Sequence, residues 1–171
     1  GDRRAGRQGA LAPCGTLRGA GCGDDEVALW DRCSDGIWVE REARAKGSWW
    51  MTFSADGALF TASRNGAIRR WDVGNLEGEE IVAAVDDWAF PIALSTDGET
   101  IATAARDGRV LLWSVRGRRL LRALPGRLPV TATAFSHDGR LVAWAEASGG
   151  VHVADVGTGA EVATFDSGRF A

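Results

Sequence analysis

The chain of 171 residues repeats itself with a period of roughly 40 residues. Four units each carry an apolar residue that leads into a glycine turn, and these apolar residues are Leu11, Phe53, Leu94 and Phe135. A second marker lies later in each unit, at Trp30, Trp71, Trp113 and Ala154. Both series keep the same spacing to within one position. Two independent markers with one period indicate a repeat architecture, in which a unit cannot bury its apolar side chains alone and must stack on its neighbours.

Within a unit, short apolar segments alternate with turn residues. Glycine adopts positive φ without a steric clash, so the Asp-Gly pairs at 97–98 and 107–108 favour tight hairpins. No segment has the length or the 3.6-residue recurrence of an amphipathic helix. The four segments of the third unit are 90–94, 100–105, 110–115 and 120–124. The pattern within each unit therefore predicts one sheet of four short antiparallel strands.

Several of these residues resemble the WD40 repeat family, whose units are propeller blades of four strands. The most specific are the Phe-Ser-x-Asp-Gly turns at 53–57 and 135–139, and the segments 64–72 and 106–113, which end in Trp-Asp and in Trp. The TolB-like propeller family shares the Ser-x-Asp-Gly turn, but the Trp-Asp endings favour WD40. The resemblance covers about residues 5–166.

The resemblance implies an all-β propeller with four blades. We place the blades at residues 5–43, 44–85, 86–125 and 126–166, and the start of a further strand at 167–171. An open arc of four blades exposes apolar sheet faces and unpaired strand edges. Closed propellers have roughly 4 to 8 blades, so three arrangements stay open. They are a longer propeller that missing chain completes, a homo-oligomer in which two copies close one ring, and a strained ring of four blades.

The family often ties each blade with a hydrogen-bonded tetrad of His, Ser or Thr, Asp and Trp. No histidine lies before any first strand of this chain, so every tetrad is incomplete. The residues that the resemblance assigns to the other three places are Trp30, Trp71, Trp113, Asp24, Asp107 and Ser63. We therefore expect blades that are held mainly by apolar stacking.

Composition argues against several classes of function. No apolar run approaches the roughly 18 to 20 residues of a membrane helix, so we expect no membrane partner. The 20 basic and 23 acidic side chains give no electrostatic footprint for nucleic acid. Three cysteines without a Cys-x-x-Cys pair and only two histidines argue against a disulfide framework and a zinc site. Lys46 is the single lysine, and this bias towards arginine indicates a GC-rich bacterial coding sequence. We also expect a cytoplasmic protein.

Two groups of residues are candidates for a partner-binding rim. Trp49, Trp88 and Phe90 lie near the entries to first strands. The resemblance places peptide binding at that rim, and large aromatic side chains are typical of binding hot spots. Arg119 and Arg122 lie on a fourth strand and suit an acidic partner. The alternatives are ordinary strand packing for the aromatic residues and a solvated face for the arginines.

The chain carries none of the motifs of a nucleophile elbow, a phosphate-binding loop or a zinc protease. We therefore expect no catalytic, cofactor-binding or metal-binding residues. The resemblance implies a non-catalytic scaffold or sensor that binds a protein or peptide within a larger signalling protein. The alternative is the propeller domain of a hydrolase whose catalytic part lies outside this chain.

Overall fold

The computed structural model describes residues 8–11, 17–21, 27–32, 38–43, 48–72, 79–85, 89, 91–126 and 129–166. Within them, the strands form four sheets, each built from four consecutive strands. Sheet 1 consists of β1 (Gln8–Leu11), β2 (Leu17–Gly21), β3 (Val27–Arg32) and β4 (Trp38–Ala43), and sheet 2 of β5 (Ser48–Phe53), β6 (Leu59–Ser63), β7 (Ala67–Trp71) and β8 (Glu79–Ala84). Sheet 3 consists of β9 (Ile92–Leu94), β10 (Thr100–Ala104), β11 (Val110–Ser114) and β12 (Arg119–Leu124), and sheet 4 of β13 (Val130–Phe135), β14 (Leu141–Glu146), β15 (Gly150–Asp155) and β16 (Glu161–Asp166).

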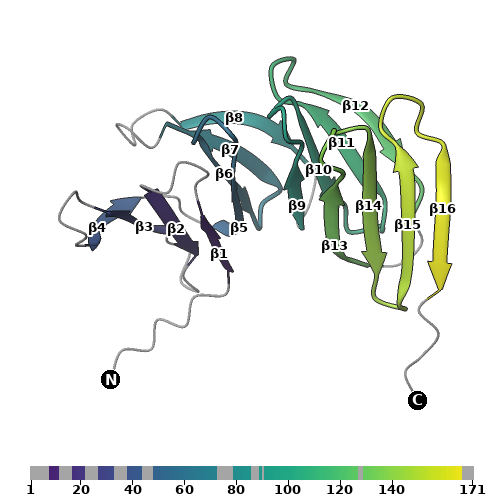
Figure 1. Cartoon of the computed structure of the whole chain (residues 1–171), viewed down its shortest axis with the longest axis horizontal. Coiled ribbons are helices and arrows are strands. Elements are labelled where there is room, and N and C mark those ends of the chain that lie inside the picture. The colour runs from purple at the N-terminus through teal and green to yellow at the C-terminus, as the bar shows by residue number, and fades with distance from the viewer. Residues whose placement is uncertain are drawn as a thin grey trace.

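Neighbouring strands within each sheet are antiparallel and follow one another in chain order. The prediction of an all-β chain with one four-stranded antiparallel sheet per unit is therefore confirmed. The sheets lie side by side, with sheet 1 at one end of the array and sheet 4 at the other (Figure 1). β5 contacts both β1 and β9, and β9 contacts β13, so the first strands of successive sheets share one edge of the array. Closure into a ring stays a prediction.

The Ser-x-Asp-Gly turns fix the hairpin between the first two strands of sheets 2, 3 and 4. In sheet 3, Ser95 Oγ donates to Asp97 Oδ1 over 2.5 Å and accepts from the Thr100 backbone N–H over 2.9 Å. Asp97 Oδ1 also accepts from the Glu99 backbone N–H over 2.9 Å. Gly98 has a φ of 72°, a left-handed conformation that favours glycine. The motif therefore recurs because each of its residues has a part in closing the turn.

These hydrogen bonds make the turn sensitive to pH. The hydrogen bond from Ser95 is the main cause that lowers the pKa of Asp97 below 3.8. A carboxyl whose pKa is lower in the folded chain contributes stability above its unfolded pKa, and this contribution is lost as pH falls through the folded pKa. We expect Ser95→Ala to lower the free energy of unfolding by about 1 kcal/mol at pH 7 and to flatten its decline below about pH 4. Urea unfolding across pH 2 to 7 checks this, with the exposed Thr96→Ala as control. An unchanged pH profile in Ser95→Ala would contradict the assignment.

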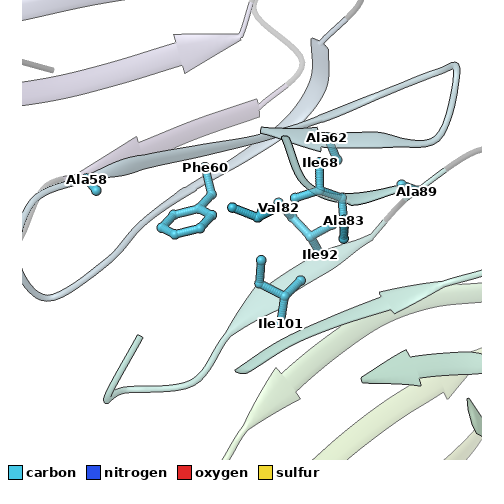
Figure 2. Packing of buried hydrophobic residues seen from close by; sticks show 9 residues of the cluster. All are labelled: Ala58, Phe60, Ala62, Ile68, Val82, Ala83, Ala89, Ile92 and Ile101. Atoms are coloured by element: carbon cyan, nitrogen blue, oxygen red, sulfur yellow. The ribbon is translucent and has the colours of Figure 1, made fainter. Parts of the chain in front are cut away.

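Apolar side chains fill the interfaces between sheets 2, 3 and 4. The cluster between sheets 2 and 3 consists of Ala58, Phe60, Ala62, Ile68, Val82, Ala83, Ala89, Ile92 and Ile101. Figure 2 shows Phe60, Val82 and Ile101 close together between the two sheets. The cluster between sheets 3 and 4 consists of Ala102, Ala104, Val110, Leu112, Leu124, Val130, Val142, Trp144 and Ala154. The core of this protein therefore lies between sheets, as the repeat predicts.

One bond of the expected tetrad is present in sheet 2, with a partner that the resemblance did not assign. Trp71 Nε1 donates to Thr61 Oγ1 over 2.9 Å in a buried position. Ser63 Oγ instead accepts a hydrogen bond from Arg69 Nη1 over 2.6 Å. Leu59 lies opposite Trp71, so both hydroxyls share a sheet face with the indole and Thr61 is the nearer one. The assignment of Ser63 was therefore wrong.

Sheet 3 lacks the corresponding bond. Thr103 and Trp113 occupy the places of Thr61 and Trp71, yet neither Thr103 Oγ1 nor Trp113 Nε1 has a hydrogen-bond partner within the described residues. Sheet 3 is therefore stabilised by apolar contacts with sheets 2 and 4 without a hydrogen bond between these two side chains.

Candidate functional site

Three of the five predicted rim residues fall within the described part of the chain. Trp49 lies in β5, where the pairing register with β6 shifts between Ser48 and Trp50. Arg119 is exposed at the start of β12, and Arg122 is half-buried in the same strand. Trp88 and Phe90 lie outside the described residues. The structure therefore places neither beside the other predicted rim residues.

Arg122 joins two sheets. Its Nη2 atom donates to the Gly157 carbonyl oxygen over 2.7 Å, in the turn between β15 and β16. A Cβ on Gly159 in the same turn would overlap the Arg122 side chain. Arg122 of sheet 3 therefore packs against a turn of sheet 4. The glycine at position 159 leaves the space that the Arg122 side chain occupies. This contact gives the residue a structural role that its place in an arginine-rich segment did not reveal.

The seam between sheets 2 and 3 is hollowed at two places, both lined by strands and by hairpin turns. The first hollow, here called the charged pocket, has a volume of about 470 Å³. Its charged lining residues are Asp56, Arg70, Glu80, Asp97, Glu99, Arg116 and Arg118. The buried ring of Phe60 lies among the lining residues as well.

Ion pairs and hydrogen bonds engage each acid in the charged pocket. Arg118 pairs with Glu80 across the seam, and Arg116 pairs with Glu99 over 2.9 Å. A hydrogen bond from Ser54 lowers the pKa of Asp56, and the nearby Arg70 guanidinium lowers it further. Asp97 is held by its own turn. Of these contacts, only the ion pair between Arg118 and Glu80 joins sheet 3 to sheet 2, and the others lie within one sheet.

Arg118 reaches Glu80 from a strained backbone. Its φ is 48°, and it is the only described non-glycine residue with a positive φ. Gly159 occupies the corresponding place in sheet 4, one repeat later, with a φ of 75°. Such a conformation in a residue with a side chain costs about 1 kcal/mol or more. The strained residue, Arg118, is thus the same residue that forms the ion pair with Glu80 between sheets 3 and 2.

The second hollow, here called the apolar pocket, has a volume of about 340 Å³. Leu111, Trp113 and Leu120 of sheet 3 line it together with Ala84 and Val85, which follow one another at the end of sheet 2. Its edge carries Arg106, Asp107 and Arg109, from the turn between β10 and β11. Arg109 Nε donates to Asp107 Oδ2 over 2.6 Å.

Two features make the apolar pocket suited to a partner. Leu120 is 43% exposed although it lies on a strand whose end, Leu124, is fully buried. The half-buried Trp113 also lines the pocket, so an indole ring lies beside the exposed leucine in its wall. The resemblance assigns Trp113 to the tetrad of its blade and not to the binding rim. The open space beside Trp113 depends on the distance between β8 of sheet 2 and β12 of sheet 3. The sequence pattern within one unit does not determine this distance.

A separate polar cluster lies on sheet 4. His152 stacks on Trp144, with ring centroids 5.2 Å apart and planes inclined by 14°. Its Nδ1 atom lies 3.2 Å from Glu161 Oε2, and its Nε2 atom lies 3.7 Å from Glu146 Oε1. The exposed His137 is in a hairpin turn and takes no part in the cluster. The described residues contain no group of His, Cys, Asp and Glu arranged to hold a metal ion, and no helix among them is suited to cross a membrane.

Comparison with known proteins connects this architecture to a family. Residues 78–114 match the family described as WD domain, G-beta repeat. This range runs from the fourth strand of sheet 2 to the third strand of sheet 3, so one sequence repeat links two sheets.

Several WD-repeat proteins are similar to the chain. WD repeat-containing protein SL1-17 of Schistosoma mansoni is 25% identical over 146 residues, which is 85% of this chain and 48% of the relative. WD repeat-containing protein 1 of Bos taurus is 41% identical over 71 residues, which is 40% of this chain and 12% of the relative. Nuclear distribution protein nudF of Aspergillus niger is 30% identical over 71 residues, covering 42% of this chain and 16% of the relative. The chain thus spans about half of the first relative and less of the others. The period, the stacked four-stranded sheets and these similarities together identify WD40 repeats in the chain.

Proposed function

We propose that this chain is a non-catalytic protein-interaction module and that the apolar pocket is its binding site. WD40 repeats typically mediate protein interactions, which supports the general class. The observation that carries the specific site is the exposure of Leu120 beside Leu111 and Trp113 in an open hollow of the seam. A partly exposed leucine beside an indole forms an apolar surface that a partner side chain can cover.

The shape of the pocket defines what it binds. A volume of about 340 Å³ accommodates one or two side chains and leaves no room for a folded domain. The partner therefore presents a bulky apolar side chain on an extended segment or a loop. Binding of this kind draws on desolvation of Leu120 and Trp113, so its affinity depends on those two side chains more than on charge.

The chain offers a matched pair of variants for the test. Leu120 and Leu121 are adjacent and have nearly equal exposure, 43% and 42%, but only Leu120 is among the residues that line the pocket. A library of displayed random peptides is selected on the wild-type chain, and the affinities of the selected peptides are measured by fluorescence anisotropy. We expect Leu120→Glu to weaken binding at least 10-fold, or about 1.4 kcal/mol, and Leu121→Glu to change it less than twofold. Selection that yields no binder, or peptides that tolerate Leu120→Glu, would contradict the proposal.

A further inference from the structure

The polar cluster on sheet 4 departs from the apolar character of the same place in sheet 3. His152 has the register position that Leu111 has in sheet 3, and Glu161 has the position of Leu120. The two leucines line the apolar pocket. The repeat thus allows apolar side chains at both positions, and sheet 4 carries titratable ones instead.

Two carboxylates flank the imidazole ring of His152. Its Nδ1 atom lies 3.2 Å from Glu161 Oε2, and its Nε2 atom lies 3.7 Å from Glu146 Oε1. Thr164 is the register partner of His152 on β16, and its hydroxyl donates to Glu161 Oε1. This hydrogen bond holds the Glu161 carboxylate beside the ring. Each nitrogen of the ring therefore faces an acid.

This arrangement distinguishes the protonated ring from the neutral one. An ionised carboxylate only accepts hydrogen bonds, and a neutral imidazole carries a single N–H. One nitrogen lone pair of the neutral ring must therefore face a carboxylate oxygen, at either Glu161 or Glu146. The imidazolium has two N–H groups, and its charge attracts both acids. The geometry suits the protonated ring at both nitrogens and the neutral ring at only one.

Partial burial of the cluster acts in two directions. The side chains of His152 and Glu146 are 22% and 8% exposed, so water solvates the charged ring poorly and also screens the carboxylates poorly. Because two acids face one ring, we expect their attraction to exceed the cost of desolvation. The ring also stacks on the indole of Trp144, whose face attracts a cation.

The other charged residues on the described strands around His152 are few. Asp166 of β16 lies on the same side of sheet 4 as His152 and adds negative charge. Arg119 and Arg122 of β12 have the register positions that face sheet 4, and their charges oppose protonation of the ring. Arg122 is bound at the β15–β16 turn. β10, β11 and β13 contain no charged residue. Acids therefore outnumber bases around the ring.

We propose that His152, Glu146 and Glu161 form a pH-sensitive clamp that holds β16 and the core residue Trp144 more firmly in acidic than in neutral solution. Trp144 belongs to the cluster between sheets 3 and 4, so the clamp acts on the interface between these two sheets. A histidine side chain in water loses its proton at about pH 6.5. Because the folded chain favours the imidazolium, the clamp contributes stability below about pH 6.5 and loses it as the pH rises and the ring gives up its proton.

The turn aspartates respond to pH with the opposite sign. Hydrogen bonds from serine side chains lower the pKa values of Asp56, Asp97 and Asp138 below 3.8. These carboxyls stay ionised from pH 5.5 to pH 7.5, so their contribution to stability is constant in that range. A change of stability between these two pH values therefore reports on the clamp.

Urea unfolding of the chain at pH 5.5 and at pH 7.5 tests the proposal. For the wild type we expect the unfolding equilibrium constant to be about 10-fold larger at pH 7.5, the effect of one charge-assisted hydrogen bond. His152→Gln is expected to reduce this factor below 2. Glu161→Gln removes the nearer acid and should reduce the factor by at least half. His137→Gln is the matched control, because the chain has only two histidines and the exposed His137 takes no part in the cluster.

The ratio between the two pH values separates the clamp from ordinary packing. Loss of the ring that stacks on Trp144 destabilises the chain at both pH values and leaves the ratio of a merely structural residue unchanged. A wild-type ratio below 2, or a ratio that persists in His152→Gln or in Glu161→Gln, would overturn the proposal. A ratio that disappears in His137→Gln would do the same, since it would assign the titration to the hairpin turn.

Discussion

Replacing Ile101 with alanine is expected to lower the free energy of unfolding by about 2 to 5 kcal/mol. Ile101 is 1% exposed and belongs to the cluster between sheets 2 and 3, where Phe60 and Val82 lie close to it (Figure 2). Truncation removes three carbon atoms from this cluster and leaves a cavity. Small domains have a net stability of only about 5 to 15 kcal/mol, so one such change is a large fraction of the total.

Urea denaturation followed by tryptophan fluorescence measures the loss. Ile101→Val removes a single methylene group and is expected to cost about 0.5 to 1.5 kcal/mol. Leu121→Ala is the control for an apolar truncation on the same sheet, and it should change stability by less than about 0.5 kcal/mol because Leu121 is exposed. Equal effects of Ile101→Ala and Leu121→Ala would show that the interface between sheets 2 and 3 does not stabilise the chain.

Gly66→Ala is expected to cost about 3 kcal/mol or more. Gly66 has a φ of 81°, and a Cβ at this position would overlap the carbonyl oxygen of Val85. The overlap follows from a close contact between the β6–β7 turn and the end of sheet 2, where the Val85 N–H donates to the Gly66 carbonyl oxygen over 3.0 Å. Two costs therefore add: strain of the left-handed backbone, about 1 to 2 kcal/mol, and displacement of the Val85 backbone.

Gly98 separates these two costs. Its φ of 72° is also left-handed, but a Cβ there would make only an ordinary contact of 3.9 Å with Ser54 Cβ. Gly98→Ala should therefore cost about 1 to 2 kcal/mol, the strain alone. Thermal unfolding of the two variants gives the comparison. A Gly66→Ala variant that is no less stable than Gly98→Ala would contradict the close approach of Val85.

The sequence predicted the strands and their grouping because both depend on local chemistry. Asp97-Gly98 and Asp107-Gly108 form turns through their own hydrogen bonds and glycine conformations, which neighbouring sheets do not alter. The constant period of the two markers then predicts that equivalent strands recur. This combination was sufficient for the all-β fold and for burial between sheets.

The contacts between sheets were not predictable in the same way. Arg122 stays a predicted rim residue, but its hydrogen bond to the Gly157 carbonyl oxygen, 35 residues away, could not be predicted from the sequence. Ser63 and Thr61 are both hydroxyl residues on one strand face, and only the register with Trp71 selects between them. The apolar pocket depends on the space between β8 and β12 and on the exposed side of Leu120. Each of these features is set by the relative position of two sheets, which no pattern within one unit encodes.

Native-state hydrogen exchange on the Ile101→Ala variant tests most directly whether these sheets stabilise one another by stacking. Ile101 belongs to β10 of sheet 3, while other members of its cluster include Phe60 in β6 and Val82 in β8 of sheet 2. If stacking holds the fold together, amide exchange should accelerate in β6 and β7 as well as in β10 and β11, by a similar factor. Acceleration confined to sheet 3, with β6 and β7 exchanging as in the wild type, would show that each sheet is stable by itself and would contradict the account.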